Sequence, residues 1–133
     1  MKTIFKKPLI LDGAIGTELI NKGVKTPLPL WSAIANEQNY DEVVKIHKSY
    51  IENGCNIITT NTFRTTERTY KKAGYKNPIL DSNNSSDLAI KAANEARNNH
   101  DILIAYSIAP LEDCYEPDNF PGQLVAFKEY DYK

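Results

Sequence analysis

Three short apolar runs, separated by stretches with helical spacing, dominate the pattern of hydrophobic and polar positions along this chain. Residues 9–11 and 101–108 are mainly apolar, and residues 55–60 combine small, apolar and β-branched side chains. Continuous runs of this kind are typical of strands buried on both faces of a parallel sheet. We therefore predict three strands, the first of which ends at Asp12 and Gly13, where the chain must turn.

The longest segment between these runs favours an amphipathic helix. Apolar residues recur at helical spacing on one face of residues 40–53. Asn39 and Glu42 form an N-terminal capping pattern in front of this segment, and Gly54 follows it. The spacing therefore predicts a helix over residues 40–53.

Two shorter helices and one alanine-rich helix complete the pattern. The shorter helices are predicted for residues 17–23 and 66–73, each closed by a glycine. A turn at Pro78 and a polar stretch come before Ser85 or Ser86, either of which can cap the alanine-rich helix. Its small-residue face is suited to close packing on a sheet.

This alternation of strands and helices predicts an α/β fold with parallel strands and helices outside the sheet. The period of the pattern does not choose between a doubly wound sheet and a (β/α) barrel. With 133 residues, of which 41% are hydrophobic and 25% charged, the chain can form one modest domain with a core.

Charge and cysteine content exclude several classes of function. Sixteen basic and seventeen acidic residues give a net charge of -1, so we expect no nucleic-acid partner and no binding to an anionic membrane surface. No apolar stretch approaches the roughly 20 residues that span a bilayer. The lack of such a stretch leads us to expect a cytoplasmic location. Two cysteines, Cys55 and Cys114, lie in unrelated contexts, so we expect no disulfide.

Asp12 is the first candidate for chemistry, because α/β proteins place ligand contacts at the carboxyl ends of buried strands. Gly13 and Gly16 lack the lysine of a P-loop and the third glycine of a dinucleotide fingerprint, so a phosphate site is disfavoured. His47 lies on the apolar face of its helix and is interpreted as a buried packing or hydrogen-bonding residue. Trp31 is interpreted as a packing anchor, with ligand stacking as the alternative.

Four stretches resemble, in this order, the successive motifs of the homocysteine S-methyltransferase family. They read Asp-Gly-Ala-Ile-Gly-Thr-Glu-Leu (12–19), Leu-Trp-Ser-Ala (30–33), Asn-Thr-Phe-Arg-Thr (61–65) and Ser-Ile-Ala-Pro-Leu-Glu-Asp-Cys-Tyr (107–115). The resemblance implies a partial (β/α)8 TIM-type barrel, about the first three β/α units of a fold of about 250 residues. Residues 1–133 would then be the amino-terminal part of a homocysteine-binding barrel domain.

The family reaction moves a methyl group from a sulfonium donor such as S-methylmethionine to the thiol of homocysteine, giving methionine. The resemblance also implies zinc in the complete family enzyme, because a thiol bound to zinc is deprotonated to the nucleophilic thiolate. The zinc cysteines belong to later strands of the family barrel. We therefore expect no zinc in this chain alone and no turnover by it, and its catalytic residues stay unknown.

The amino-acid end of the substrate is where the resemblance can be carried over. Asp12, with Gly13 beside it, matches the family position that contacts the homocysteine ammonium group, although Asp-Gly is also a common turn. The other candidate substrate-binding residues are Asn61, Thr62, Phe63, Arg64 and Glu112. For Glu112, which belongs to the long connection after the third strand, a solvated loop acid is the alternative.

Two further hypotheses stay open. The chain can be a truncated, non-catalytic half-barrel that binds an amino acid weakly or assembles with a carboxyl-terminal half-barrel or with itself, since three strands leave two unpaired edges. It can also be an unrelated (β/α) enzyme with a similar opening. The methyl donor is not visible in these motifs.

Overall fold

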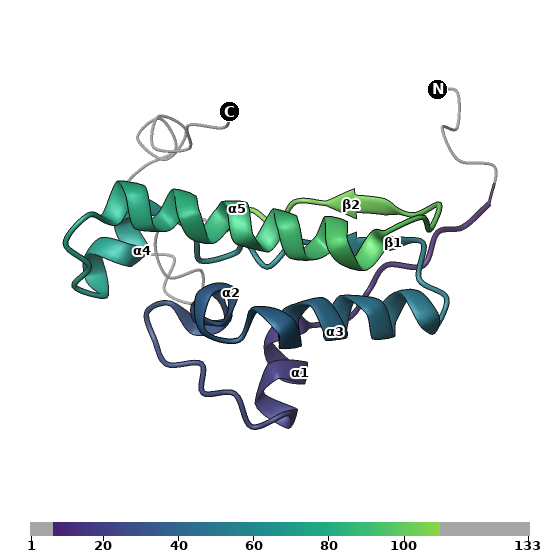
Figure 1. The fold of residues 1–133 in the computed structure, drawn as a ribbon, viewed down its shortest axis with the longest axis horizontal. Helices are drawn as coiled ribbons and strands as arrows, with labels where there is room; N and C mark the ends of the chain where they lie inside the picture. Colours follow the sequence, from purple (N-terminus) through teal and green to yellow (C-terminus); the bar gives the residue numbers. More distant parts are fainter. Residues whose placement is uncertain (1–6, 110–133) are drawn as a thin grey trace.

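The computed structural model describes residues 7–109. Its elements follow in the order α1 (Ile15–Asn21), the 3-10 helix η1 (Trp31–Ile34), α2 (Ala35–Gln38), α3 (Tyr40–Glu52), β1 (Ile57–Thr59), α4 (Glu67–Lys72), α5 (Pro78–Arg97) and β2 (Leu103–Ala105) (Figure 1). Helices and strands alternate along the chain. The predicted α/β class is therefore confirmed.

The sheet is parallel and small. Ile57 of β1 lies opposite Leu103 of β2, and Thr59 lies opposite Ala105. The predicted first strand contributes a single parallel bridge, from Leu11 to Ile57. Three aligned segments thus meet with β1 in the middle, but the described residues contain two strands rather than the three predicted.

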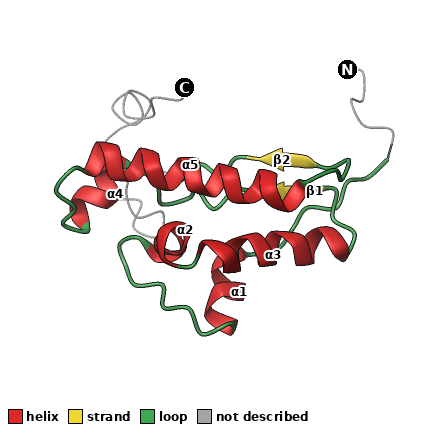
Figure 2. Ribbon diagram, in the orientation of Figure 1, coloured by secondary structure: helices red, strands yellow, loops and turns green. Residues whose placement is uncertain are grey.

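The prediction that the strands are buried on both faces is wrong. Ile10 is 60% exposed, Leu11 57% and Leu103 47%, whereas Ile58 is fully buried. Ile58 belongs to the hydrophobic core that α3 and α5 share, and these two helices lie side by side (Figure 2). Within residues 7–109 the helical core therefore covers the face of the sheet that carries Ile58, whereas Leu11 and Leu103, which both align with Ile57, stay exposed on the other face.

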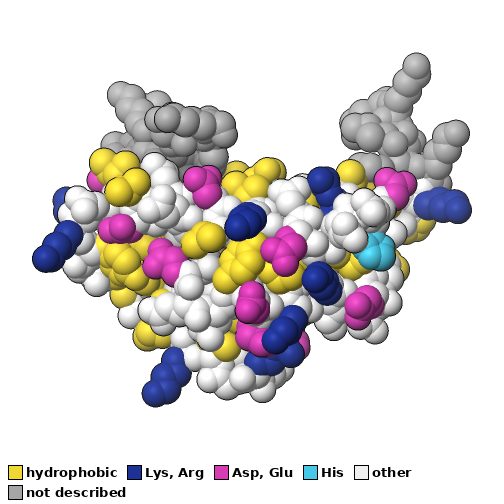
Figure 3. Space-filling view, viewed as in Figure 1, with side chains coloured by type: hydrophobic (Ala, Val, Ile, Leu, Met, Phe, Trp, Pro, Cys, Tyr) yellow, Lys and Arg dark blue, Asp and Glu magenta, His cyan; other side chains and the backbone are white. Residues whose placement is uncertain are grey.

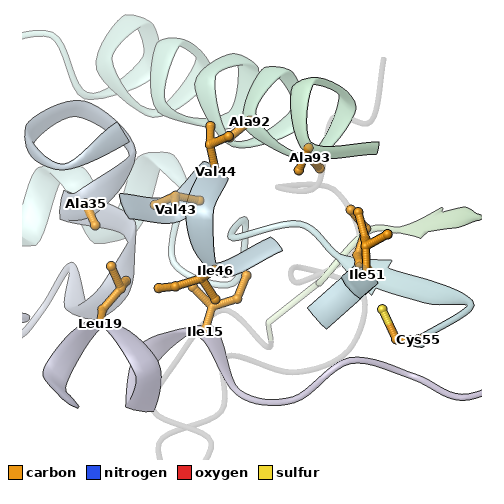
Figure 4. Packing of buried hydrophobic residues seen from close by; sticks show 12 residues of the cluster. Ile15, Leu19, Ala35, Val43, Val44, Ile46, Ile51, Cys55, Ala92 and Ala93 are labelled. Atoms are coloured by element: carbon orange, nitrogen blue, oxygen red, sulfur yellow. The ribbon is translucent and has the colours of Figure 1, made fainter. Parts of the chain in front are cut away.

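The core joins α1, α2, α3, α5 and β1. Figure 4 shows Val44 of α3 pointing toward Ala92 of α5, and Ile46 of α3 toward Ile15 of α1. The alanine face of α5 is buried, and α5 packs against α3. Small side chains on α5 let the two helix axes approach closely.

Helix α3 begins and ends close to the predicted positions, after Asn39 and before Gly54. Gly54 has φ +93, a left-handed conformation that glycine adopts without the steric cost of a Cβ. The predicted capping bonds do not form: Asn39 makes no side-chain cap bond, and the Glu42 carboxylate pairs with Lys45 at 2.6 Å and with Lys22 at 3.9 Å. A capping box would need the Glu42 carboxylate, which is instead engaged in these ion pairs.

The predicted start of the alanine-rich helix at Ser85 or Ser86 is wrong. Helix α5 begins at Pro78, because proline at the first helical position needs no hydrogen bond and already has a helical φ. Ser85 is buried in the middle of the helix rather than at its cap. Helix α1 likewise begins two residues earlier than predicted, at Ile15.

Helix α4 matches its prediction, and the side chain of Thr66 accepts a hydrogen bond from the backbone of Thr69 at its start. On the face drawn in Figure 3, Lys and Arg side chains are interspersed with Asp and Glu, in keeping with a net charge of -1. Of the helices in residues 7–109, none is long and apolar enough to cross a membrane.

Candidate functional site

The carboxylate of Asp12 is fixed at the carboxyl end of β1. Asp12 directly follows the bridge residue Leu11, and its backbone N–H donates to the carbonyl of Ile57 at 2.9 Å. Thr59, the last residue of β1, donates its backbone N–H to Oδ2 of Asp12 at 2.7 Å and its hydroxyl to Oδ1 at 2.8 Å. Both oxygens are therefore held in place by one neighbouring residue.

Partial burial raises the pKa of the Asp12 carboxyl above its usual range, while the two hydrogen bonds from Thr59 act in the opposite direction. Each carboxylate oxygen can accept more than one hydrogen bond, so the group keeps acceptor capacity beyond Thr59. Partial desolvation also strengthens its attraction for a cation. A half-buried carboxylate in this position is suited to bind an ammonium group.

Gly13 makes room for an aromatic ring beside Asp12. A Cβ at Gly13 would lie 2.7 Å from the hydroxyl oxygen of Tyr50 and 3.0 Å from two ring carbons. Burial raises the pKa of Tyr50, and the nearby charges of Glu18 and Asp12 add to this effect. The ring of Tyr50, which comes from α3, thus lies against the turn that carries the carboxylate.

Asn61 is held in a buried polar network. Its side-chain amide donates to the carbonyl of Ser32 at 2.8 Å and to Oδ1 of Asn36 at 2.8 Å. Asn36 in turn donates to the backbone carbonyl of Asn61 and to the hydroxyl of Ser85, each at 3.0 Å. The Asn61 side chain therefore fixes the segment after β1 to η1, α2 and α5, and its predicted contact with substrate stays a prediction.

Thr62 joins the two segments that follow the strands. Its hydroxyl donates to the carbonyl of Ser107 at 2.7 Å and lies 2.9 Å from the hydroxyl of Thr60. Ser107 follows β2, so this bond ties the carboxyl ends of both strands together. The polar groups of Asp12, Thr62 and Ser107 accordingly follow three neighbouring segments of the sheet, at their carboxyl ends.

Phe63 and Arg64 form the tip of a tight turn. The backbone N–H of Thr65 donates to the carbonyl of Thr62 at 3.3 Å, and the Thr65 hydroxyl donates to the same carbonyl at 3.1 Å. The hydroxyl of Ser86 on α5 donates to the Thr65 hydroxyl at 2.7 Å. The turn is therefore anchored at both of its ends.

The guanidinium of Arg64 lies near two aromatic rings. Its central carbon is 5.8 Å from the ring centroid of Trp31 and 5.6 Å from that of Phe63. Contacts of this kind contribute about 0.5–2 kcal/mol each, depending on desolvation. The Nε atom of Arg64 is buried and has no hydrogen-bond partner among the described residues.

The interpretation of His47 as a buried residue is confirmed, since its side chain is fully buried in α3. Neither ring nitrogen has a hydrogen-bond partner within residues 7–109, and burial lowers the pKa of His47 to about 4. Trp31 is half-buried, and the guanidinium of Arg64 lies over its ring.

Residues 7–109 do not offer a zinc site. They contain no group of three or more His, Cys, Asp or Glu side chains placed to hold a metal ion. Cys55 is buried and free, and burial, followed by the charge of Asp12, raises the pKa of its thiol, which disfavours the thiolate that binds metals. Glu112 and Cys114 lie outside the described residues.

Three residues of this region were not predicted from sequence. Thr59 could have been found by aligning Asp12 with the end of the second strand in a parallel sheet, because that alignment brings the two residues together. From the sequence, Tyr50 could be assigned to the apolar face of its helix, but its contact with Gly13 could not be predicted. Asn36 gives no signal, since nothing in its local sequence distinguishes a buried asparagine from a surface one.

The alternating elements define an α/β protein, and the polar groups lie at the carboxyl ends of parallel strands, where α/β proteins place ligand contacts. A sequence model of the family described as homocysteine S-methyltransferase matches residues 9–132. The chain therefore belongs to the homocysteine S-methyltransferase family, as its motifs predict.

Named relatives agree with this assignment. Homocysteine S-methyltransferase 2 of Saccharomyces cerevisiae is 30% identical over 103 residues, which covers 70% of this chain and 31% of that protein. Homocysteine S-methyltransferase 3 of Zea mays is 34% identical over 89 residues, covering 67% of this chain and 26% of that protein.

The fold resembles a solved structure, the metallated form of the homocysteine methyltransferase MmuM from Escherichia coli. The TM-score is 0.77 at 25% sequence identity, and the match covers 92% of this chain and 47% of the E. coli protein. This chain thus spans less than half the length of that enzyme and about a third or less of the two curated relatives.

Proposed function

We propose that this chain forms the homocysteine-binding, amino-terminal part of a homocysteine S-methyltransferase, and that Asp12 binds the ammonium group of the substrate. The observation that carries the proposal is the Asp12 carboxylate, which Thr59 holds by two hydrogen bonds at the carboxyl end of β1. A carboxylate fixed in this way needs little reorganisation to receive a cation, so less binding energy is lost in ordering the site.

The methyl transfer itself is part of the proposal at the level of the complete protein. A methyl group would pass from a sulfonium donor such as S-methylmethionine to the homocysteine thiol, giving methionine. Zinc, when bound in the complete family enzyme, would stabilise the homocysteine sulfur as the deprotonated, nucleophilic thiolate. Because the described residues do not fit a zinc site, we assign them to the binding of the amino-acid end of homocysteine and not to the activation of its thiol.

The barrel architecture also belongs to this proposal. The Leu11 segment pairs with β1, and β1 pairs with β2, all in parallel and in chain order. Consecutive parallel neighbours of this kind support the first three β/α units of a (β/α)8 barrel, with residues 1–133 as the amino-terminal part of the domain. The predicted cytoplasmic location stays a prediction.

A second candidate function is favoured by the exposed face of the sheet. Leu11 and Leu103, which both align with Ile57 and so share one face of the sheet, are each about half exposed or more. Apolar side chains grouped on a sheet are usually covered in a stable protein. This favours a non-catalytic half-barrel that assembles with a carboxyl-terminal half-barrel or with a second copy.

Replacement of Asp12 by asparagine tests the ammonium assignment. Asp12→Asn keeps the shape of the side chain and an acceptor for the Thr59 backbone, but it removes the charge. We expect homocysteine affinity, measured by isothermal titration calorimetry on the whole chain, to fall about tenfold or more, because a hydrogen bond between charged groups is lost.

Asp87→Asn is the matched control, because Asp87 is exposed on α5 and the variant carries the same change of charge. Its affinity for homocysteine should equal that of the wild type. An unchanged affinity in Asp12→Asn would contradict the assignment. A parallel assay for methionine tests the expectation that this chain alone has no turnover, and formation of product would contradict it.

A further inference from the structure

We propose that Arg64 binds the carboxylate of an amino-acid substrate, and that Trp31 and Phe63 hold its guanidinium in position for that contact. The carboxylate can come from homocysteine or from the sulfonium amino acid that donates the methyl group. This inference rests on the proposed function for the identity of the ligand. It deepens that proposal, because it adds a partner for the anionic end of the substrate.

The backbone under Arg64 is fixed from several sides. The turn between Thr62 and Thr65 is closed by its own hydrogen bonds. Thr62 is bonded to Ser107 after β2, and Thr65 is bonded to Ser86 on α5. These anchors fix the position of the backbone from which the Arg64 side chain extends.

The backbone that carries the Trp31 ring is held by its own set of hydrogen bonds. The backbone N–H of Trp31 donates to the carbonyl of Pro27 at 2.8 Å, and the next residue, Ser32, accepts a hydrogen bond from Asn61. Trp31 also has φ +53, a conformation that is unusual and costly for a bulky residue. Asn61, two residues after β1, thus links η1 to the segment that leads to Arg64.

Two aromatic neighbours restrict where the guanidinium can form hydrogen bonds. A guanidinium that packs against rings keeps its N–H donors in its own plane, away from the ring faces. The Nε atom of Arg64 is buried without an acceptor, and Arg64 forms no salt bridge within residues 7–109. Within residues 7–109 the guanidinium of Arg64 is therefore a cation without an anionic partner, and its Nε–H has no acceptor.

A carboxylate is the ligand that fits this group. Its two oxygens match the N–H donors of a guanidinium in a planar, bidentate arrangement, which a lysine could not provide. Arg64 follows β1 by five residues, on the same carboxyl side of the strands as Asp12. An amino acid carries an ammonium and a carboxylate, so the two protein charges are complementary to one class of ligand.

Fluorescence titration of the whole chain tests the proposal, because Trp31 is its single tryptophan and lies against Arg64. Two pairs of probes are used: homocysteine with 3-aminopropanethiol, and S-methylmethionine with its decarboxylated sulfonium amine. Each pair differs by the carboxylate alone. In the wild type we expect the amino acid to bind about tenfold more tightly than its analogue in one of the pairs.

In Arg64→Gln this preference should disappear, while the decarboxylated analogue binds as it does to the wild type. Arg64→Lys, which keeps the charge but not the planar fork, should retain part of the preference. Arg97→Gln on α5 is the control for loss of one positive charge and should behave as the wild type. The pair that shows the preference identifies the source of the carboxylate.

Three results would overturn the inference: no carboxylate preference of the wild type in either pair, a preference that survives in Arg64→Gln, or an equal loss of affinity for both members of a pair. The last result would mean that Arg64 acts on the fold. Failure of the ammonium assignment is separate, because it is read from Asp12→Asn and the Arg64 comparison varies only the carboxylate.

Discussion

His47 lies fully buried on α3, and both of its ring nitrogens are without a hydrogen-bond partner among the described residues. A buried imidazole of this kind is stable only in its neutral form, because the charged form would lose its hydration without gaining a partner. Burial accordingly lowers the pKa of His47 to about 4, from an ordinary value of 6.5. The residue couples the stability of the core to pH.

We predict that stability falls as the pH drops from about 6.5 to about 4. In this window the unfolded chain binds a proton at His47 and the folded chain does not, so acid favours unfolding. The loss over the whole window should approach about 3 kcal/mol. Urea unfolding at a series of pH values measures it.

The matched variants are His47→Leu, which should lose this part of the pH dependence, and His100→Gln, which changes an exposed histidine and should keep it. An identical pH profile in His47→Leu and the wild type would show that the histidine is not responsible.

For single residues, the sequence predicted the candidates for a functional or buried role better than it predicted the residues that they contact. Asp12 follows from its place after an apolar run, and His47 follows from helical spacing. The role of Gly13 as the contact of Tyr50 could not be predicted, because it depends on how α3 packs over the first turn. Arg64 was a candidate without an assigned contact until its two rings were known.

Several elements meet at one buried asparagine. Asn36, on the short helix α2, bonds to Asn61 after β1 and to Ser85 in the middle of α5. Its side chain is 1% exposed, so an unpaired group here would have no water to replace the lost partner. The network positions the segment between β1 and α4, which carries Phe63 and Arg64.

We predict that Asn36→Ala lowers the free energy of unfolding by about 2–3 kcal/mol, because it removes the buried hydrogen bonds that Asn36 makes with Asn61 and Ser85. Asn94→Ala is the control: Asn94 is exposed on α5 and bonds only within its own helix turn, to Ile90, and to Arg97. The control should stay within about 0.5 kcal/mol of the wild type. Equal urea midpoints for the two variants would refute the role given to Asn36.

The elements themselves were predictable where one local signal dominated. Helix α3 has a clear apolar face and a glycine after its end, so its bounds agree with the prediction. Helix α5 was misplaced at its start because Pro78 is compatible with both a turn and a first helical position. The buried positions in its first turns include the polar residues Ser82 and Ser85, so the sequence shows no apolar face there. Their burial depends on tertiary contacts.

For the whole molecule, the α/β class and the family could be predicted because they depend on element order and on motifs. The exposure of Leu11 and Leu103 could not, because it depends on what packs against the second face of the sheet. The chain spans less than half the length of the E. coli enzyme that it resembles. The expectation that this chain alone holds no zinc and has no turnover stays a prediction.

The most direct test of the central claim compares homocysteine with 4-mercaptobutanoate, which lacks the amine, on the wild type and on Asp12→Asn. If Asp12 receives the ammonium group, loss of the amine should weaken binding to the wild type by about tenfold or more and binding to Asp12→Asn far less. An equal loss for both proteins would contradict the account, because the ammonium group would then bind elsewhere.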